Sequence, residues 1–310
     1  MNKKLISIFL IILFLLSGCS LQKGPSLGNS LNIQLTVSKD FSENIIFDKK
    51  IQAESGDTIM DILEKNLDVE TASDGFVNAI NGLKSEMNGM TSKDWFFYVN
   101  GIASNCSAKA YHLRQGDKIL WDYHEWDGNS FIPAIIGAYP EPFINGFEGK
   151  TAGVRIYYAD EFKDEALKLK ESLGRFKAKN VNTAPLGDSF ETKPGFPSII
   201  IGEYGKISNN KIVAKLISDN GNKGIFARFS KNAITLLDYS GMPKKVDMPI
   251  SGVVCATADS LGDTAPVWII TSIEHKQVEN LINLIYSKEG SIKDYYGAAL
   301  IKGKLERLPN

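Results

Sequence analysis

The sequence is poor in the residues that make metal centres and disulfide frameworks. Its 310 residues include three cysteines and three histidines, and no spacing among them is typical of a zinc site. Cys19 ends an N-terminal apolar segment, which leaves Cys106 and Cys255 for the body of the protein. A disulfide between these two cysteines is possible in an oxidising compartment, but a single disulfide is not the framework of a fold. We therefore expect no metal centre and no disulfide-rich fold.

Positive charge is not in excess either. The chain has 35 Lys and Arg against 36 Asp and Glu, and loss of the two N-terminal lysines lowers the net charge to about −3. A nucleic-acid-binding protein needs a basic stripe to meet phosphates, so nucleic acid is excluded as a partner. The chain also lacks a Walker loop, and Gly202-Glu203-Tyr204-Gly205 has the wrong spacing for a nucleotide-binding glycine fingerprint.

The N-terminal apolar run, Leu5 to Leu16, follows Lys3 and Lys4. As a helix it would span about 18 Å, which is too short for a bilayer core of about 30 Å but typical of a signal peptide. The run ends in Leu16-Ser17-Gly18-Cys19, which resembles the bacterial lipobox. The resemblance implies a signal peptide at 1–18, an acylated Cys19, a flexible tether at 19–30 and a protein anchored in the lipid bilayer at the outer face of the cell membrane. An ordinary cleaved signal or an N-terminal anchor is the alternative.

Aromatic residues concentrate in one segment, between Trp95 and Trp126. Eight of its 32 residues are aromatic, against 10% for the whole chain, and it holds three of the four tryptophans. Such density at strand-like spacing predicts either an aromatic core or a surface that binds a large, flat ligand.

The surrounding residues, 31–126, predict a small β-rich domain. Alternating apolar positions indicate a strand at 31–37, and a second strand near 45–51 would complete a hairpin. Asp57 or Thr58 then caps a helix that ends near Asn66. Further strands are expected at 77–80, 95–100 and 118–123. Two strands, one helix and further strands are the order of a β-grasp-like fold.

The same residues resemble a known family. Ser55-Gly56-Asp57-Thr58 before a helix, then Trp95 with Tyr98-Val99-Asn100-Gly101, and then Tyr111, Gly116-Asp117 and Trp121 are similar to the transcobalamin-like C-terminal domain family. In transcobalamin and intrinsic factor a similar domain lies over one face of the corrin ring, so the resemblance implies cobalamin or a related corrinoid as the bound ligand. The α-helical barrel that holds the other face in those carriers is absent from this chain.

Strand alternation separates core from contact candidates within the aromatic segment. Trp95 and Phe97 share the side of Val99 and are expected in the core, whereas Tyr98 is expected at the surface, so that replacing it should weaken ligand binding without unfolding the domain. The hairpin after Val99 offers an exposed loop of small residues. The ligand-binding candidates are Tyr98, Asn100, Gly101, Ile102, Ala103, Ser104, Trp121, Tyr123 and Trp126. His112 and His124 are candidate axial ligands of cobalt, although a lone histidine is more often a polar surface residue.

Beyond a linker at 127–150, residues 151–310 predict a second domain. Strands and helices alternate there, which is typical of an α/β layered fold with a mostly parallel sheet. The overall fold class is therefore α+β, with a β-grasp-like domain followed by a larger α/β domain of unknown role. Asp259, Ser260 and His275 make no catalytic triad because no nucleophile-elbow pattern accompanies them.

These observations favour a binding protein that is not an enzyme and needs no cofactor. Our leading hypothesis is an extracytoplasmic lipoprotein that captures cobalamin or another corrinoid to support its uptake, with a membrane importer as its partner. The alternative is a surface interaction or adhesion module that binds a protein or a glycan through the β-grasp-like domain.

Overall fold

The computed structural model describes residues 30–72, 75–88, 91–126, 131–188, 190–218, 223–245, 249–287 and 290–309. The expected signal peptide, Cys19 and most of the tether lie outside these ranges, as do the first four residues of the expected linker. Within the described ranges, no helix combines the length and the apolar character needed to cross a membrane.

The first domain is built on a mixed sheet that confirms the β-grasp-like prediction. Its spatial order is β2 (Asn44–Ala53), β1 (Leu31–Lys39), β9 (Lys118–Trp126), β7 (Thr91–Val99) and β6 (Glu86–Asn88), with β8 (Ile102–Ala103) also paired to β7. The first and last long strands, β1 and β9, run parallel at the centre, and the other pairs are antiparallel. A small second sheet joins β3 (Val69–Thr71), β4 (Val77–Ile80) and β5 (Leu83–Lys84).

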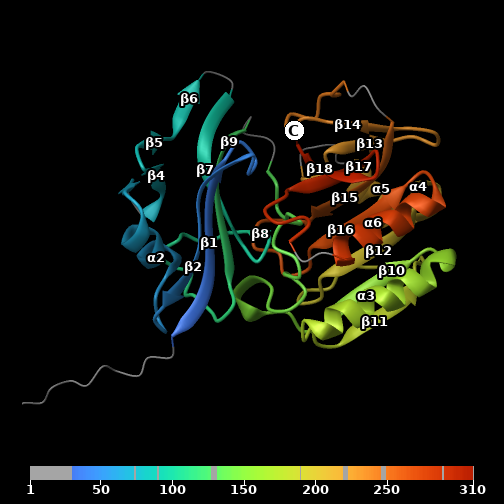
Figure 1. Cartoon of the computed structure of the whole chain (residues 1–310), viewed down its shortest axis with the longest axis horizontal. Helices are drawn as coiled ribbons and strands as arrows, with labels where there is room; N and C mark the ends of the chain where they lie inside the picture. Colours follow the sequence, from blue (N-terminus) through green and yellow to red (C-terminus); the bar gives the residue numbers. More distant parts are fainter. Residues whose placement is uncertain are drawn as a thin grey trace, which may run out of the picture.

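One helix, α2 (Ile59–Asn66), covers one face of the mixed sheet (Figure 1). Thr58 begins it through the predicted cap: its side chain accepts from the Asp61 amide, and the Asp61 carboxylate accepts from the Thr58 amide. The helix buries Ile59, Ile62 and Leu63 against the sheet. The opposite face of the sheet is turned toward the second domain (Figure 1).

The second domain contains a seven-stranded sheet. Its order is β11 (Val181–Pro185), β10 (Val154–Tyr158), β12 (Ser198–Glu203), β16 (Val267–Ser272), β15 (Ile250–Thr257), β17 (Gly297–Ile301) and β18 (Lys304–Leu308). The first four strands are mutually parallel, and β17 points the same way because it runs antiparallel to β15, which is antiparallel to β16. The predicted α/β layers with a mostly parallel sheet are therefore confirmed. A separate hairpin joins β13 (Ala227–Phe229) and β14 (Ile234–Leu236).

Helices cover both faces of this sheet. The turn η3 (Asp160–Phe162), α3 (Lys163–Arg175) and α6 (His275–Ser287) pack on one face, around Ile156, Ile199 and Ile270. The short α4 (Tyr204–Ile207) and α5 (Lys211–Ser218) pack on the other, where Ile200 and Ile269 share one apolar cluster with Tyr98 and Leu120 of the first domain. That shared cluster joins the two domains.

The segment between the domains belongs to this interior. Apart from one turn, η2 (Phe147–Gly149), residues 131–150 form neither helix nor named strand, yet most of them are buried. Ile136, Tyr139 and Phe143 enter the core beneath α3 and α6, and the Ile135 amide donates to the Gly101 carbonyl of the first domain. The predicted linker is thus a packed part of the fold.

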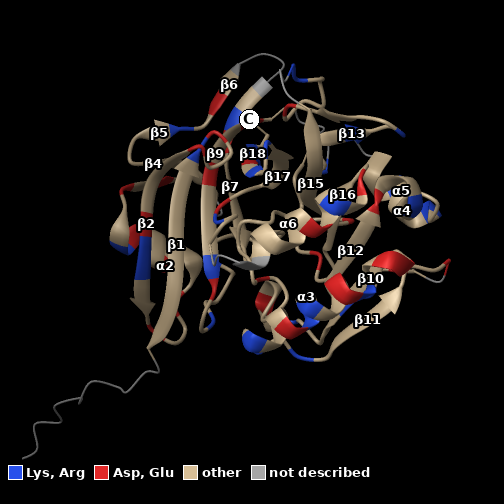
Figure 2. Cartoon of the chain, turned by 45° about the vertical axis from the view of Figure 1, so that its right-hand side comes forward, with Lys and Arg blue, Asp and Glu red and all other residues tan. Residues whose placement is uncertain are grey.

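Charged residues of both signs are spread over the two domains in the part of the chain that the structure describes (Figure 2). The polar surface of α3 and the ends of β10 and β12 carry several acidic residues.

Candidate ligand-binding site

A cavity of about 510 Å³ lies beside β7, where the first domain meets the second. Its walls come from the β-grasp-like sheet, from the loop 103–108, from residues 131 and 132, and from Tyr239 and Leu261 of the second domain. Ligand pockets for small molecules span about 300–1,000 Å³ and are mostly apolar with a few polar groups. Aromatic side chains dominate the lining: Phe41, Phe76, Trp95, Phe96, Phe97, Tyr98, Trp121, Trp126, Phe131 and Tyr239.

The cavity follows a gap in strand pairing along β7. On its outer edge β7 pairs with β6 up to Lys93 and with β8 from Tyr98 onward, and the Ser104 amide donates to the Phe97 carbonyl. Among the described residues no strand pairs with Asp94–Phe96 on this edge. Successive side chains of a strand point to opposite faces. The gap therefore lets side chains from both faces of the sheet reach one cavity.

From the α2 side, the cavity receives Phe97 and Trp121. Their rings stack with centroids 4.7 Å apart and an interplanar angle of 25°. Phe97, expected in the core, is half-buried and lines the cavity, whereas Trp95 is buried and donates its Nε1 proton to the Leu83 carbonyl at 3.0 Å.

From the side of the second domain, the cavity receives His124. Its imidazole is sandwiched between Phe41 and Phe96, with ring centroids at 4.4 Å and 4.5 Å, and Tyr296 meets it edge-on. His124 Nδ1 lies 2.7 Å from an oxygen of Asp122. Both faces of the ring are thus covered, and only its edge can meet a ligand.

Asp122 determines which nitrogen of His124 carries the proton. This fully buried carboxylate also accepts from the Ser38 hydroxyl, the Ser42 amide and Tyr296 Oη, at 2.5 Å, 2.9 Å and 3.2 Å. Burial alone would raise the pKa of Asp122, but the hydrogen bonds from His124, Ser38 and Ser42 hold that pKa below its ordinary value. The ionised carboxylate accepts a hydrogen bond from Nδ1–H of His124. In a neutral imidazole the other nitrogen, Nε2, is then left as an acceptor.

Two buried donors at the cavity have no partner. The indole Nε1 atoms of Trp121 and Trp126 are both inaccessible to solvent and make no hydrogen bond within the described part of the chain. A buried unpaired donor costs about 1–3 kcal/mol unless a ligand or water satisfies it. Both indoles belong to residues of the cavity lining, as does the imidazole of His124.

The structure brings five of the predicted ligand-binding residues to this cavity: Tyr98, Ala103, Ser104, Trp121 and Trp126. Tyr98 contributes to the wall, but it is only 2% exposed and packs edge-on against Tyr296, with centroids 5.4 Å apart. The expectation of a surface position for Tyr98 is therefore wrong, because its face of β7 is covered by the second domain.

Asn100 and Gly101 occupy the predicted tight turn, with φ angles of 55° and 80°, but Asn100 does not reach the cavity. Its fully buried amide donates to Asp117 at 2.9 Å and to the Gly146 carbonyl at 2.8 Å, and it accepts from the Lys118 amide. Since its hydrogen-bonding groups are used inside the protein, Asn100 is a structural residue. Gly101 instead lines a second cavity, described below.

Ile102, Tyr123 and His112 also lie away from the aromatic cavity. Ile102 is in the core beneath α2, and Tyr123 donates its hydroxyl proton to the Lys84 carbonyl at 2.7 Å. His112 forms a bridge with Thr58 and places Nδ1 3.1 Å from the Gly56 carbonyl. Of the two candidate axial ligands, the structure brings only His124 to the cavity.

Sequence analysis missed Phe41, Phe96, Tyr239 and Leu261 as lining residues. Phe96 was identifiable in principle, because it shares the alternation of Tyr98 and His124 across the pleat. Phe41 lies in the turn between β1 and β2 with φ 57°, and Tyr239 follows β14 in the second domain. No local pattern indicates that these distant residues meet.

A second cavity, of about 530 Å³, lies between the domains and has a more polar lining. Gln34, Lys118, Lys293 and Asp294 contribute side chains, and Lys118 Nζ donates to the carbonyls of Ala138 and Tyr139. Burial raises the pKa of Asp294 to about 6. Lys118 and Lys293 are thus engaged with protein groups at this cavity.

Asp259, Ser260 and His275 do not come together as a catalytic triad in the structure. Asp259 and Ser260 follow β15, whereas His275 follows β16, and these strands run antiparallel. Asp259 and Ser260 therefore lie beyond one end of these strands, and His275 lies beyond the other end. Cys106 and Cys255 are both free, the former beside the cavity and the latter buried in β15.

Comparison with known proteins gives limited matches. Residues 56–125 match the family described as a domain of unknown function, DUF4430. Haptocorrin in complex with Cbi is 18% identical over 33% of this chain and 27% of its own, with a TM-score of 0.26. A candidate metal-binding protein from Ruminococcus gnavus is 17% identical over 31% of this chain and 98% of its own, with a TM-score of 0.25. No curated protein matches.

Proposed function

We propose that this protein is an extracytoplasmic binding protein, anchored through acylated Cys19, that holds cobalamin or a related corrinoid at the aromatic cavity and delivers it to a membrane importer. It carries out no reaction on that ligand. The observation that carries the proposal is the cavity itself, whose mostly aromatic lining includes two tryptophans with unpaired indole donors and the imidazole of His124.

The chemistry of the lining suits such a ligand. A corrin presents a broad apolar perimeter fringed with amides, and aromatic faces bury apolar surface while polar groups fix its orientation. A small rotation of either indole on binding would bring its buried Nε1 proton to an amide carbonyl oxygen of the ligand, and His124 Nε2 would accept from an amide N–H. Each bond to an indole would satisfy a donor that has no partner within the described residues.

His124 is a hydrogen-bond acceptor in this proposal, and not an axial ligand of cobalt. Its side chain is 5% exposed between Phe41 and Phe96, so the centre of a flat ring cannot approach Nε2 without moving one of those phenyl rings. Aquocobalamin should therefore bind without the absorption change that replacement of its axial water by imidazole would cause. Such a change would show that the phenyl rings open and that His124 binds cobalt.

Calorimetry tests the proposal on a soluble form that begins at Ser30. Cyanocobalamin should release or absorb heat on binding, and the protein should retain the red colour through desalting. Trp121→Phe keeps the stacked ring and removes the indole donor, so it should weaken binding by about 5- to 30-fold, which corresponds to a bond of about 1–2 kcal/mol. Trp268→Phe, a buried tryptophan in the other domain, is the matched control and should leave affinity unchanged.

Absence of both heat and retained colour would overturn the proposal. In that case the alternative, an interaction module for a protein or glycan, would gain support if cross-linking on the cell surface recovered a partner. Phe76 is 74% exposed at the cavity and offers such a partner an apolar contact. Loss of cross-linking on Phe76→Ser would locate that interface.

A further inference from the structure

In the parallel part of the second sheet, the order in which successive strands are added reverses between β10 and β12. The chain runs from β10 through α3 to β11 on one side, and then returns across β10 to place β12 on the other side. In open α/β sheets, ligands bind beyond the carboxyl ends of the strands at such a switch point, because the flanking connections diverge to opposite faces and leave a crevice. The aromatic cavity is elsewhere, so this edge of the sheet has no assigned role.

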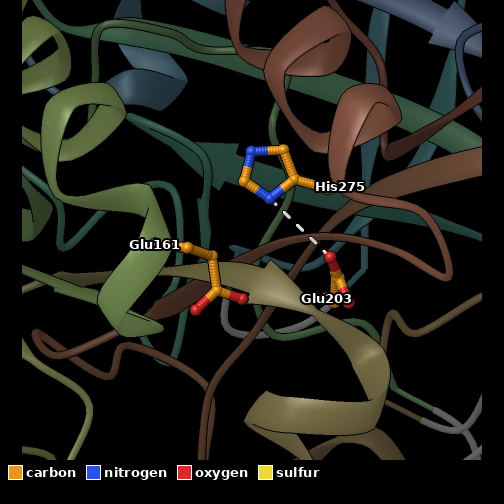
Figure 3. Close-up of side chains that lie close together, drawn as sticks. All are labelled: Glu161, Glu203 and His275. Atoms are coloured by element: carbon orange, nitrogen blue, oxygen red, sulfur yellow. Dashed lines mark ion pairs between the residues drawn. The ribbon is translucent and has the colours of Figure 1, made fainter.

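Three side chains that can bind a metal meet at this edge. Glu161 follows β10 in η3, Glu203 is the last residue of β12, and His275 is the first residue of α6, directly after β16. One potential ligand atom from each lies within 4.8 Å of the other two. Figure 3 shows the carboxylates of Glu161 and Glu203 and the imidazole of His275 directed toward a common space. The carboxyl ends of three parallel strands, β10, β12 and β16, thus contribute one residue each to the cluster.

The imidazole of His275 is held in the orientation that a metal ligand requires. Nδ1 faces Glu203 Oε1 at 3.7 Å, while Nε2 faces the Glu279 carboxylate at 3.4 Å from the opposite side. The ring also stacks on Phe162, with centroids 4.4 Å apart and an interplanar angle of 21°. Metal-bound histidines almost always donate their second ring N–H to a carboxylate, which fixes the tautomer and the ring plane. Glu279 provides that carboxylate, one helical turn after His275.

We infer that Glu161, Glu203 and His275 form a binding site for a divalent first-row transition-metal ion such as Zn²⁺. One nitrogen and two carboxylate oxygens suit Zn²⁺, and three protein ligands leave a fourth position for water. Bonds of about 2.0–2.1 Å in tetrahedral geometry place ligand atoms about 3.3 Å apart. The Nδ1 to Oε1 distance of 3.7 Å is already close to that value, and a Glu161 oxygen lies within 4.8 Å of both other ligand atoms.

Lys206 pairs with one of the three proposed ligands, Glu161, in the structure. This pair holds the pKa of Glu161 below its ordinary value despite some desolvation. The Lys206 side chain is 53% exposed on α4, so it can return to water when a divalent ion replaces it. Metal binding and the Lys206 ion pair therefore compete for the same carboxylate. Removal of this lysine should strengthen metal binding, which a purely structural ion-pair cluster does not predict.

The experiment is a Zn²⁺ titration of the untagged protein from Ser30 onward, in competition with a chromophoric chelator at pH 7. The wild type should bind one Zn²⁺ per chain. Glu203→Gln and His275→Asn should each lower the affinity by at least 100-fold, and Glu279→Gln by about 10- to 100-fold through loss of the orienting carboxylate. Lys206→Met should bind Zn²⁺ more tightly than the wild type.

The matched control is Glu171→Gln, an exposed carboxylate on α3 that pairs with Arg175, and its affinity should equal that of the wild type. All of these side chains are at least partly exposed, and circular dichroism will confirm that each variant is folded. Absence of Zn²⁺ binding by the wild type would overturn the inference. Equal affinities for the wild type, Glu203→Gln and His275→Asn would overturn it as well, because the metal would then be bound elsewhere.

Discussion

Asp122 and His124 lie two residues apart on β9 and are joined by a hydrogen bond of 2.7 Å on the face that meets the second domain. The same carboxylate accepts from Ser38 on β1, from the backbone of the turn at Phe41 and Ser42, and from Tyr296 in the second domain. One buried anion therefore orients a residue of the cavity wall and connects the two domains. Stability and, under the proposed function, ligand binding therefore depend on the same group.

Asp122→Ala should lower the free energy of unfolding by about 3–5 kcal/mol, because donors from two domains would lose their acceptor in a buried site. Urea denaturation at pH 7 measures this loss. The pKa of Asp122 is held below its ordinary value of 3.8, so its contribution is present above that pH and is lost as the pH falls through the lower, folded-state pKa. Glu171→Gln, at an exposed ion pair, should change stability by less than about 0.5 kcal/mol. A small effect of Asp122→Ala would contradict this account.

Tyr98→Ala should destabilise the protein by about 3–5 kcal/mol, as expected for removal of a large buried aromatic side chain. Its ring packs against Tyr296 and lies in the apolar cluster shared by the two domains. Tyr98→Phe keeps the ring and should retain most of the stability. Thermal unfolding of both variants distinguishes this interpretation from a surface contact, since a surface tyrosine would tolerate alanine with little change in melting temperature.

The contrast between Tyr98 and Thr58 shows how far the sequence can predict this fold. Thr58 and Asp61 are three residues apart, and their mutual cap depends only on local backbone geometry, so the start of α2 was predictable. Alternation also placed Tyr98 correctly on the face of β7 opposite Trp95 and Val99. It could not tell whether that face meets water or another domain, because the covering residues, such as Tyr296, lie almost 200 positions away. The same long separation explains why Phe41 and Tyr239 were missed.

Asn100→Ala should lower stability by about 2–4 kcal/mol while leaving ligand affinity unchanged. The side chain makes three hydrogen bonds inside the protein, and its removal leaves the Gly146 carbonyl and the Lys118 amide without those partners. Its φ of 55° adds strain for alanine, since asparagine tolerates this region better than most residues. Urea denaturation and calorimetry with cyanocobalamin measure the two quantities. Asn105 is an exposed residue of the cavity lining and serves for comparison. Asn105→Ala can change ligand affinity without lowering the stability of the protein.

Asp294→Asn should remove a specific pH dependence of stability. Burial beside the second cavity raises the pKa of Asp294 from 3.8 to about 6, so the folded protein binds more protons than the unfolded chain between these values. The contribution of Asp294 to stability should then fall as the pH rises from about 4 to 6, by about 3 kcal/mol at 1.36 kcal/mol per pKa unit.

Urea denaturation at pH 4, 5, 6 and 7 measures this slope in the wild type and in Asp294→Asn. Asparagine is uncharged at every pH and accepts the φ of 61° at this position, so the variant should have a smaller slope than the wild type and be more stable than it at pH 7. Asp259→Asn, at an exposed loop position, should retain the wild-type slope. If Asp294→Asn kept the full slope, Asp294 would have to be ionised in the folded protein at pH 5, and the Lys293 ammonium group 3.7 Å away would then outweigh its burial.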